Sequence, residues 1–344
     1  MKIIHCADIH LGCALADLGR EKSEERRREL RATFERIISF AEQNGVRAII
    51  LAGDVFDTAR PYLRDKKFFY DAVRAHPSID FLYLRGNHDI ESGYECALEN
   101  LKTFSSKWQG YRYDDADIYG AELPYDGDMY AELMPERNSF NIVILHGQLN
   151  ADFNIVKLRN KNIDYLALGH IHTYSSGDID VRGKYAYCGC PEGRGFDETG
   201  EKGFILLDTA ARSMQFIPFA RRTIREYDAD IGGCSGAYEA YERIRRMYPP
   251  EREAIVRFNL RGNLAFRDAR LAEEIKSYLS GAYYFVDVKD KTSVRANVAA
   301  DAAETTLKGQ FCRSVLSDPS LSDEDKARVI DVGLNALSGK EGEI

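Results

Sequence analysis

Metal-binding residue types recur in five short clusters along the first half of the chain. Each cluster contains histidine, aspartate or asparagine, whose side chains are common ligands of divalent ions. The clusters are Asp8-Ile9-His10-Leu11-Gly12, Gly53-Asp54-Val55-Phe56-Asp57, Gly86-Asn87-His88-Asp89, His146-Gly147-Gln148 and Gly169-His170-Ile171-His172. Five of the seven histidines lie in these clusters, so the pattern favours one polar centre over a set of unrelated turns.

The spacing inside the clusters favours a common target. Asp8 and His10 are two residues apart, and side chains at that separation point the same way on an extended chain. His170 and His172 repeat the arrangement. Imidazole, carboxylate and amide oxygen together suit a first-row divalent ion such as manganese, iron or zinc.

The candidate ligands are more numerous than one ion takes. They are Asp8, His10, Asp54, Asn87, His146, His170 and His172. A two-ion site follows, with one carboxylate bridging ions roughly 3.5–4 Å apart. Asp54 is the predicted bridge, because it follows a glycine at a strand end and leaves similar ligand sets on either side. The glycines before Asp54, Asn87 and His170 permit close backbone approach.

Each cluster follows an apolar segment that is typical of a buried strand. These segments are residues 2–7, 47–52, 80–84, 141–145 and 165–168. Helical periodicity predicts helices over 22–44 and 64–75, and residues 203–207 and 213–217 form a predicted hairpin. Strands alternating with helices indicate an α/β fold whose sheets are covered on both faces. In open α/β sheets the site lies at the carboxyl ends of the strands, where the clusters are.

The pattern changes after residue 218. Strands over 222–230, 254–260 and 283–289 alternate with helices over 233–247 and 266–280, a βαβαβ unit, and helices follow over 301–316 and 322–338. The sequence therefore predicts three parts. They are residues 1–219, with the ligand clusters, residues 220–297, the βαβαβ unit, and residues 298–344, a helical segment.

Composition excludes several classes of protein. The 344 residues are 44% apolar and 30% charged, a globular rather than disordered balance. No apolar run reaches the roughly 18 residues of a membrane span, and the start lacks a secretory signal. The seven scattered cysteines therefore predict reduced thiols in the cytoplasm. The net charge is −8, but residues 221–300 carry +3, the one basic block.

Several residues have ordinary structural interpretations. His5 lies within a strand and is predicted to be a core or sheet-face histidine. His76 precedes Pro77 and is predicted to cap a helix end. Arg60 is predicted to be a surface arginine, with contact to a DNA phosphate as the less favoured alternative. The Arg26-Arg27-Arg28 run has acidic residues interspersed at helical spacing, which predicts a solvated helix face and not a nucleic-acid patch.

The five clusters resemble the motifs of the calcineurin-like metallophosphoesterases, which share a two-layer β-sandwich flanked by helices. The flanks of the first, second and fourth clusters resemble the SbcD-type nucleases of double-strand-break repair. So do Pro191-Glu192, Phe196-Asp197-Glu198 and Gly200-Glu201-Lys202-Gly203. Cys190 departs from the pattern, since these relatives tend to have serine there, and it is predicted to be a loop detail outside the chemistry. The resemblance covers about residues 1–295.

The resemblance implies a role for each site residue. One ion would be held by Asp8, His10, Asp54 and His172, and the other by Asp54, Asn87, His146 and His170. His88 would not bind metal but would stabilise or protonate the leaving oxygen, with Asp89 tuning it. Both ions would be manganese.

The resemblance also implies a substrate and partners. The chain would be a 3′–5′ exonuclease of double-stranded DNA, with single-strand endonuclease activity, that binds DNA backbone and ends without reading sequence. The βαβαβ unit would be a DNA-capping domain, and the chain could form a homodimer. The last two helices would dock an SMC-like ATPase of the SbcC type or pack back onto their own domain. They carry apolar residues Leu307, Phe311, Val315, Leu316, Val329, Ile330, Val332, Leu334 and Leu337.

Two other functions compete with this one. A phosphodiesterase of small or cyclic nucleotides would use the same motifs, because this fold serves several phosphoester substrates. A DNA-end-binding scaffold for the ATPase would need no complete ligand set, so the seven ligands and His88 argue against it.

Overall fold

The structure is a computed structural model that describes residues 1–13, 18–92, 98–125, 128–265, 268–294, 302–303 and 305–337. The chain divides into two compact units, Met1–Ile224 and Arg225–Ile344. The described residues do not include Cys96, residues 266–267, 301, 304 and 338 of the predicted helices, residues 295–297 of the predicted second part, or residues 298–300 and 339–344 of the predicted third part. None of the described helices is long and apolar enough to cross a membrane.

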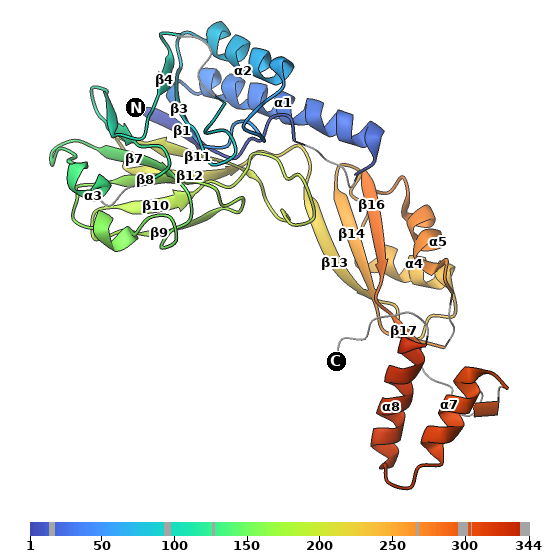
Figure 1. Cartoon of the computed structure of the whole chain (residues 1–344). Helices are drawn as coiled ribbons and strands as arrows, with labels where there is room; N and C mark the ends of the chain where they lie inside the picture. The colour runs from blue at the N-terminus through green and yellow to red at the C-terminus, as the bar shows by residue number, and fades with distance from the viewer. Residues whose placement is uncertain are drawn as a thin grey trace. The chain divides into compact units, whose positions relative to one another are not determined.

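The first unit contains two sheets of six strands each (Figure 1). The first sheet has the order β12-β11-β1-β2-β3-β4, and β1 to β4 run parallel. Its strands are β1 (Lys2–Cys6), β2 (Val46–Ala52), β3 (Asp80–Leu84), β4 (Leu101–Thr103), β11 (Gly203–Asp208) and β12 (Ser213–Pro218). The predicted hairpin is confirmed, because β11 and β12 pair antiparallel.

The second sheet has the order β5-β6-β7-β8-β10-β9. Its strands are β5 (Gln109–Arg112), β6 (Asp117–Gly120), β7 (Asn141–His146), β8 (Tyr165–Gly169), β9 (Ser175–Asp178) and β10 (Lys184–Tyr187). Strands β6, β7, β8 and β10 run parallel. The sequence does not predict β4, β5, β6, β9 and β10, which are short.

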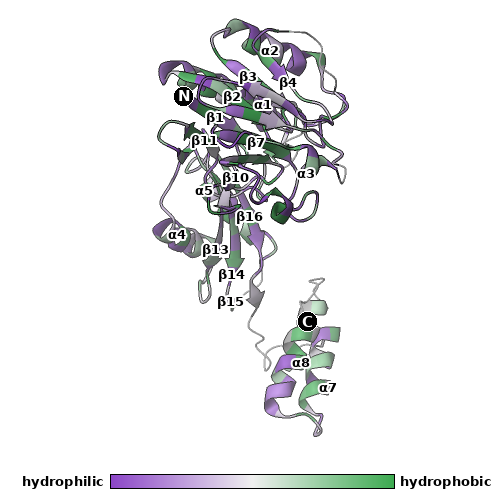
Figure 2. Cartoon of the chain, turned by 90° about the vertical axis from the view of Figure 1, so that its left-hand side faces the viewer, coloured by the Kyte–Doolittle hydropathy of each residue, from purple (hydrophilic) through white to green (hydrophobic). Residues whose placement is uncertain are grey.

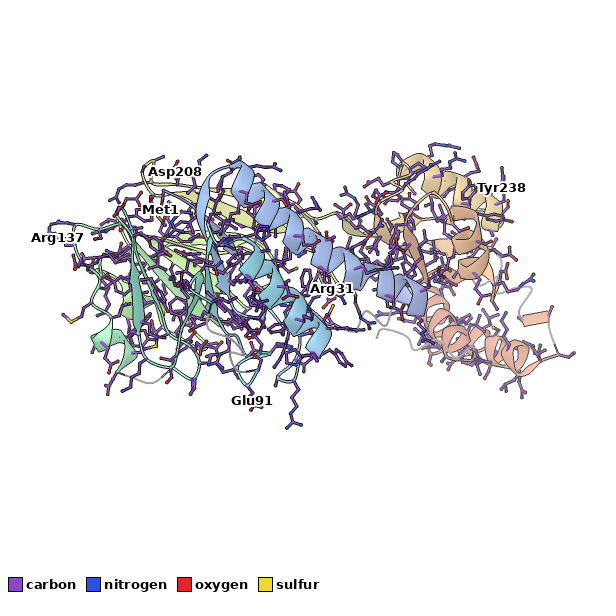
Figure 3. The ribbon with its side chains drawn as sticks, turned by 90° about the horizontal axis from the view of Figure 1, so that it is seen from above. Met1, Arg31, Glu91, Arg137, Asp208 and Tyr238 are labelled. Atoms are coloured by element: carbon purple, nitrogen blue, oxygen red, sulfur yellow. The ribbon has the colours of Figure 1, made fainter. Side chains whose placement is uncertain are left out.

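Alternation along the strands separates three apolar layers. On β1, Ile4 faces helices α1 (Arg20–Gln43) and α2 (Leu63–Ala75), whereas Ile3 faces the second sheet. On β7, Ile144 joins the layer between the sheets and Val143 the layer beyond, with α3 (Met129–Glu132) and the 3-10 helix Ile155–Leu158. Figure 3 shows α1 and α2 side by side over the first sheet. The predicted α/β class with a two-sheet core is confirmed.

The second unit contains the predicted three-stranded sheet, in the order β13-β14-β16. Its elements are β13 (Ile224–Asp230), α4 (Ala237–Met247), β14 (Ile255–Arg261), α5 (Leu271–Leu279) and β16 (Phe285–Asp290), with the short pair β15 (Asn263–Leu264) and β17 (Ser293–Val294). Helix α4 begins four residues later than predicted, after Gly236. The apolar faces of α4 and α5 pack against the sheet.

The last two helices form a small hairpin with its own core. Helices α7 (Leu307–Leu316) and α8 (Asp323–Ala336) bury Cys312, Val315, Ile330 and Leu334 between them. A side chain at Gly333 would collide with Phe311, since a Cβ there would lie 2.1 Å from the ring. Other apolar residues of the hairpin stay exposed, and Figure 2 shows hydrophobic and hydrophilic stretches alternating along both helices.

The two histidines outside the five clusters have the structural roles that the sequence predicts. His76 follows the last residue of α2, and its Nδ1 donates to the carbonyl oxygen of Ala72 at 2.8 Å. His5 is fully buried on β1, and its Nδ1 bonds the hydroxyl of Tyr165 on β8 at 2.8 Å. The pair joins the two sheets.

His5 should make the first unit sensitive to acid. Burial lowers the pKa of His5 from 6.5 to about 3. The unfolded chain therefore binds a proton below pH 6.5 that the folded chain refuses, so stability falls as the pH drops from 6.5 towards 3. Between pH 7 and pH 4, the free energy of unfolding of the wild type should fall by up to about 3 kcal/mol more than that of His5→Gln. Urea unfolding across that range measures this, and identical pH slopes would contradict it.

Candidate metal centre

The carboxyl ends of β1, β2, β3, β7 and β8 bring the five clusters together. The two sheets meet there through His146, whose Nδ1 donates to the carbonyl oxygen of Ala52 at 2.8 Å. Asp8, His10 and His172 offer ligand atoms within 4.8 Å of one another, and so do Asp8, Asp54 and His146. The structure therefore assembles residues that are up to 164 positions apart in sequence around one point.

The first predicted ligand set is closely grouped. Nε2 of His10 and Nε2 of His172 face each other at 3.3 Å. Oδ1 of Asp8 lies 3.9 Å from Nε2 of His172, and Oδ2 of Asp54 lies 3.8 Å from Nε2 of His10. Two nitrogens and two carboxylates thus converge on a common space.

The second predicted set surrounds the amide of Asn87. Its Oδ1 lies 3.0 Å from Nε2 of His146 and 3.1 Å from Nδ1 of His170. Oδ2 of Asp54 lies 3.4 Å from Nε2 of His146. One oxygen of Asp54 is therefore within 4 Å of a histidine nitrogen from each set, which is the place required of a bridge. The two groups together contain all seven predicted ligands.

The ring nitrogens that point away from this space are held by acceptors. His10 Nδ1 donates to Asp57 Oδ1 at 3.0 Å, and His172 Nδ1 donates to Glu198 Oε1 at 2.7 Å. His146 uses the Ala52 carbonyl in the same way. A proton fixed on Nδ1 leaves the Nε2 lone pair of a neutral imidazole free for a cation. The donor set and its orientation fit divalent metal binding.

Backbone strain is concentrated at the same residues. Asp8, His10, Asp54 and His170 have φ values of 52°, 50°, 52° and 99°, in the left-handed region. Residues other than glycine are uncommon there, although aspartate, asparagine and histidine enter it more often than most, so the surrounding fold holds these four against a conformational cost. Such outliers are typical of functional sites.

Glycines let the strand ends approach. A Cβ at Gly169 would lie 1.9 Å from the Ala52 carbonyl oxygen, and one at Gly53 would lie 2.0 Å from Nδ1 of His146. A Cβ at Gly86 would lie 2.3 Å from Oδ1 of Asp54. The predicted need for glycine before Asp54, Asn87 and His170 is confirmed.

Burial and charge shift the pKa values of the cluster in opposite directions. Burial raises the pKa of Asp8 to about 6 and lowers that of His10 to about 4. Burial also disfavours the charged forms of His146 and Asp54, but their mutual hydrogen bond and the attraction of neighbouring opposite charges, Asp8 for His146 and His10 for Asp54, together outweigh it. These interactions raise the pKa of His146 to about 9 and lower that of Asp54 to about 2. The raised pKa of His146 favours its protonated form beside these carboxylates, and a divalent ion would compete with that proton.

Comparison with known proteins identifies the protein family of this chain. Residues 1–174, just over half of the chain, match the family model of the calcineurin-like phosphoesterases. The chain belongs to this family. All seven predicted ligands of the phosphoesterase lie within the matched residues.

Curated relatives of the phosphoesterase extend the similarity. A DNA double-strand break repair protein Mre11 of Aeropyrum pernix is 26% identical over 72% of this chain and 68% of its own length. The Haloferax volcanii protein of the same name is 25% identical over 76% of this chain, which spans 61% of that relative. The Sulfurisphaera tokodaii protein of the same name is 23% identical over 96% of this chain and 92% of its own length.

His88 and Asp89 of the phosphoesterase differ sharply in exposure. His88 is exposed, its Nδ1 donates to the Asp57 carbonyl oxygen at 3.0 Å, and its backbone N–H donates to Asp54 Oδ1 at 2.9 Å. Asp89 is buried and accepts from the N–H of Gly86, the N–H of Phe56 and the hydroxyl of Tyr83. Burial raises the pKa of Asp89 to about 6. These contacts support a role in shaping the loop of His88, while tuning of His88 stays a prediction.

Three supporting residues of the phosphoesterase are not among the predicted site residues. Asp57 and Glu198 hold His10 and His172, and Arg194 bonds both carboxylates. Asp57 lies in a recognised cluster, and Glu198 lies in the Phe196-Asp197-Glu198 motif, so their positions carried a signal. Their partners could not be read from it, because Asp57 and Arg194 are 137 residues apart.

One prediction for the phosphoesterase needs correction. Arg26 and Glu29 are buried and not solvated, because Arg26 bonds Glu29 and Glu192 and because Arg222 bonds Glu29. Partners from distant segments turn an apparently exposed charge run into a buried ionic network. Cys190 lies in a loop as predicted, and its Sγ is 3.6 Å from Oε2 of Glu198.

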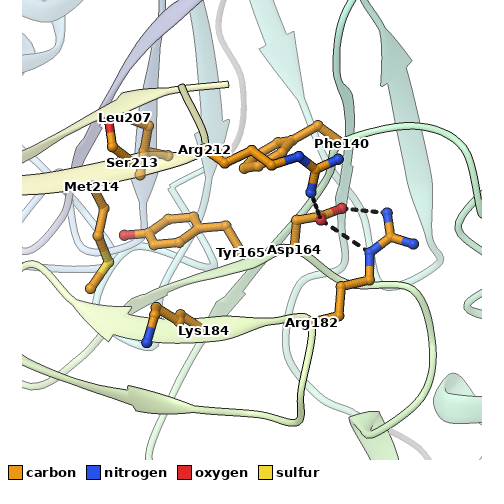
Figure 4. A pocket seen from close by; sticks show the side chains of 9 residues that line it. All are labelled: Phe140, Asp164, Tyr165, Arg182, Lys184, Leu207, Arg212, Ser213 and Met214. Atoms are coloured by element: carbon orange, nitrogen blue, oxygen red, sulfur yellow. Dashed lines mark hydrogen bonds and ion pairs between the residues drawn. The ribbon is translucent and has the colours of Figure 1, made fainter. Parts of the chain in front are cut away.

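A separate pocket of the phosphoesterase lies near the opposite ends of the strands (Figure 4). Asp164 is its central polar group and forms ion pairs with Arg182 and Arg212, at 2.6 Å in each case. The aromatic walls are Phe140 and Tyr165. Because one carboxylate serves both arginines, the cluster is a structural brace on this edge.

Proposed function

We propose that this phosphoesterase is a metal-dependent DNA nuclease that hydrolyses phosphodiester bonds at two divalent ions. We propose Mn²⁺ as the physiological metal at both positions. The phosphoesterase would act as a 3′–5′ double-strand exonuclease and cleave single strands as an endonuclease. The observation that carries the proposal is the place of Asp54 Oδ2, within 4 Å of Nε2 of both His10 and His146. One carboxylate oxygen between two ligand sets is the arrangement that a two-ion phosphoesterase needs.

In the proposed mechanism, some residues hold the metal ions and another donates a proton. When bound, two divalent ions supply positive charge to the phosphate and an activated water. Asp8, His10 and His172 would hold one ion, Asn87, His146 and His170 the other, and Asp54 both. His88 lies at the exposed edge, and its ring centroid is 4.9 Å from that of His10. With Nδ1 held by the Asp57 carbonyl, its Nε2 can carry a proton to the departing oxygen of the DNA strand.

Two observations support DNA as the substrate. Several relatives are named as DNA double-strand break repair proteins, and one similarity covers 96% of this chain, including the second unit. Residues 221–300, which form most of that unit, have a net charge of +3 in a chain of net charge −8. A basic block suits contact with the phosphate backbone, which does not require sequence readout.

End-labelled duplex DNA tests the proposal. With Mn²⁺, a 3′-labelled strand should release labelled mononucleotide, while a 5′-labelled strand should give a shortening ladder. Chelation of the metal should stop both reactions. An intact duplex together with cleavage of a generic aryl phosphodiester would refute DNA as the substrate of the chain. Rapid hydrolysis of cyclic nucleotides would then favour the small-molecule phosphodiesterase.

The exposed face of the α7–α8 hairpin supports the proposed ATPase partner. Leu307, Val332 and Leu337 are 69%, 53% and 49% exposed, although the hairpin has a closed core of its own. We propose that this face binds an SMC-like ATPase of the SbcC type. Val332→Glu should abolish co-purification with the ATPase and leave aryl diester hydrolysis unchanged. Val181→Glu, at an exposed valine of the first unit, is the control, and unaltered co-purification of both variants would refute the dock.

A homodimer and a cytoplasmic location belong to the same proposal. Sedimentation of the purified chain tests the first, and fractionation of cells tests the second. A monomer at micromolar concentration would remove the dimer from the proposal without affecting the nuclease assignment.

A further inference from the structure

One side of the metal centre is backed by charged side chains from residues 190–202, beyond the residues that match the family model. We propose that Glu198, Asp57 and Arg194 are positioning residues that set the affinity of the ion held by His10 and His172, and leave the other ion unaffected. The inference rests on the proposed two-ion function and assigns a role to the Phe196-Asp197-Glu198 motif.

Each of the two histidines has its own carboxylate. Glu198 Oε1 accepts from His172 Nδ1 at 2.7 Å, and Asp57 Oδ1 accepts from His10 Nδ1 at 3.0 Å. The Glu198 side chain is 4% exposed and that of Asp57 is 25% exposed. A carboxylate on the far ring nitrogen fixes the tautomer and increases the basicity of the nitrogen that faces the metal.

Arg194 holds the two carboxylates in these positions. Its Nη1 lies 3.3 Å from Asp57 Oδ1, its Nε lies 3.0 Å from Glu198 Oε1, and its Nη2 lies 2.5 Å from Glu198 Oε1. The Arg194 side chain is 17% exposed, so these contacts are shielded from water. The guanidinium offsets the repulsion between two carboxylates and prevents either from turning inwards as a ligand.

The backbone of His172 is clamped by the same segment. Nζ of Lys202 donates to the His172 carbonyl oxygen at 2.7 Å, and the backbone N–H of Cys190 approaches it at 3.4 Å. Lys202 is buried, which is unusual for a lysine and implies that the contact holds it. His172 is therefore restrained at both its ring and its main chain.

The second ligand set is held differently. His146 Nδ1 donates to the neutral carbonyl of Ala52, and His170 directs its backbone N–H to Asp8. In the contacts of the described residues, the anchors on the far side of these two rings include no counterpart of the Glu198–Arg194 pair. An ionised anchor raises ligand basicity more than a neutral carbonyl does, so the network should act on one ion.

Titration of the metal-free protein with Mn²⁺ alone tests the inference. Calorimetry measures the binding steps, and electron paramagnetic resonance distinguishes paired from isolated ions. Glu198→Gln should weaken one of two binding steps by ~10- to 100-fold and leave the other unchanged. The coupled spectrum of paired Mn²⁺ should then give way to that of isolated Mn²⁺. The weakened step should be the one lost in His172→Ala. Asp57→Asn provides a second route to the same result, through His10.

Asp164→Asn is the matched control, because Asp164 is also a buried carboxylate paired with an arginine (Figure 4) but precedes β8, at the end opposite the centre. It should leave both steps as in wild type. Equal weakening of both steps in Glu198→Gln, or an equal change in the control, would overturn the inference. A wild-type protein that binds two ions but does not cut DNA would refute the proposed substrate and leave the positioning role standing.

Discussion

Replacement of His88 by alanine should lower the rate of phosphodiester hydrolysis by ~10²- to 10⁴-fold, the usual contribution of a general acid. The ring of His88 is exposed at the edge of the centre, and a backbone carbonyl of Asp57 holds its Nδ1. No ligand atom of the proposed pair of ions is removed by the change. The backbone N–H of residue 88, which donates to Asp54, also remains in the variant.

Single-turnover hydrolysis, together with Mn²⁺ titration of the same preparation, separates chemistry from metal binding. The expected result is two ions bound and a much slower rate. His76→Ala is the control, since His76 caps a helix away from the centre, and it should behave as wild type. Loss of an ion from His88→Ala would place His88 among the ligands, as its proximity to His10 and Asp57 would then explain.

The buried strands could be predicted because their sequences are nearly continuous apolar runs. Strands β1, β2, β3, β7 and β8 are buried along most of their length, and burial on both faces leaves that pattern. Strands β5 and β9 are mostly exposed edge strands, with no alternation to reveal them. Their place follows from pairing with neighbours, which is a tertiary effect.

The convergence of the ligands could be predicted for a topological reason. Parallel strands end on the same edge of a sheet, so residues that follow such strands meet without any detailed knowledge of the loops. The second layer of contacts could not be predicted in this way. The bonds of Arg194 to Asp57 and of Arg26 to Glu192 join loops and helices whose approach depends on the packed structure.

Replacement of Asp54 by asparagine should have an equally large effect, but through the ions themselves. Asp54 Oδ2 lies between His10 and His146, and its Oδ1 is taken by the N–H of His88. An amide keeps the shape but removes the charge that both proposed ions share. Loss of their charge stabilisation, worth several kcal/mol, corresponds to a rate lower by at least about 10³-fold.

The distinguishing feature of Asp54→Asn is that both Mn²⁺ binding steps should weaken together, whereas a ligand of one ion should affect one step. His170→Ala is the informative partner, because Nδ1 of His170 approaches Asn87 and not the His10–His172 pair. Calorimetric titration of the two variants makes the comparison, with circular dichroism to establish that each is folded. An Asp54→Asn protein that retains one Mn²⁺ binding step at wild-type affinity would show that Asp54 serves a single ion. Asp8 would then become the candidate bridge, because its carboxylate also lies near His172 and His146.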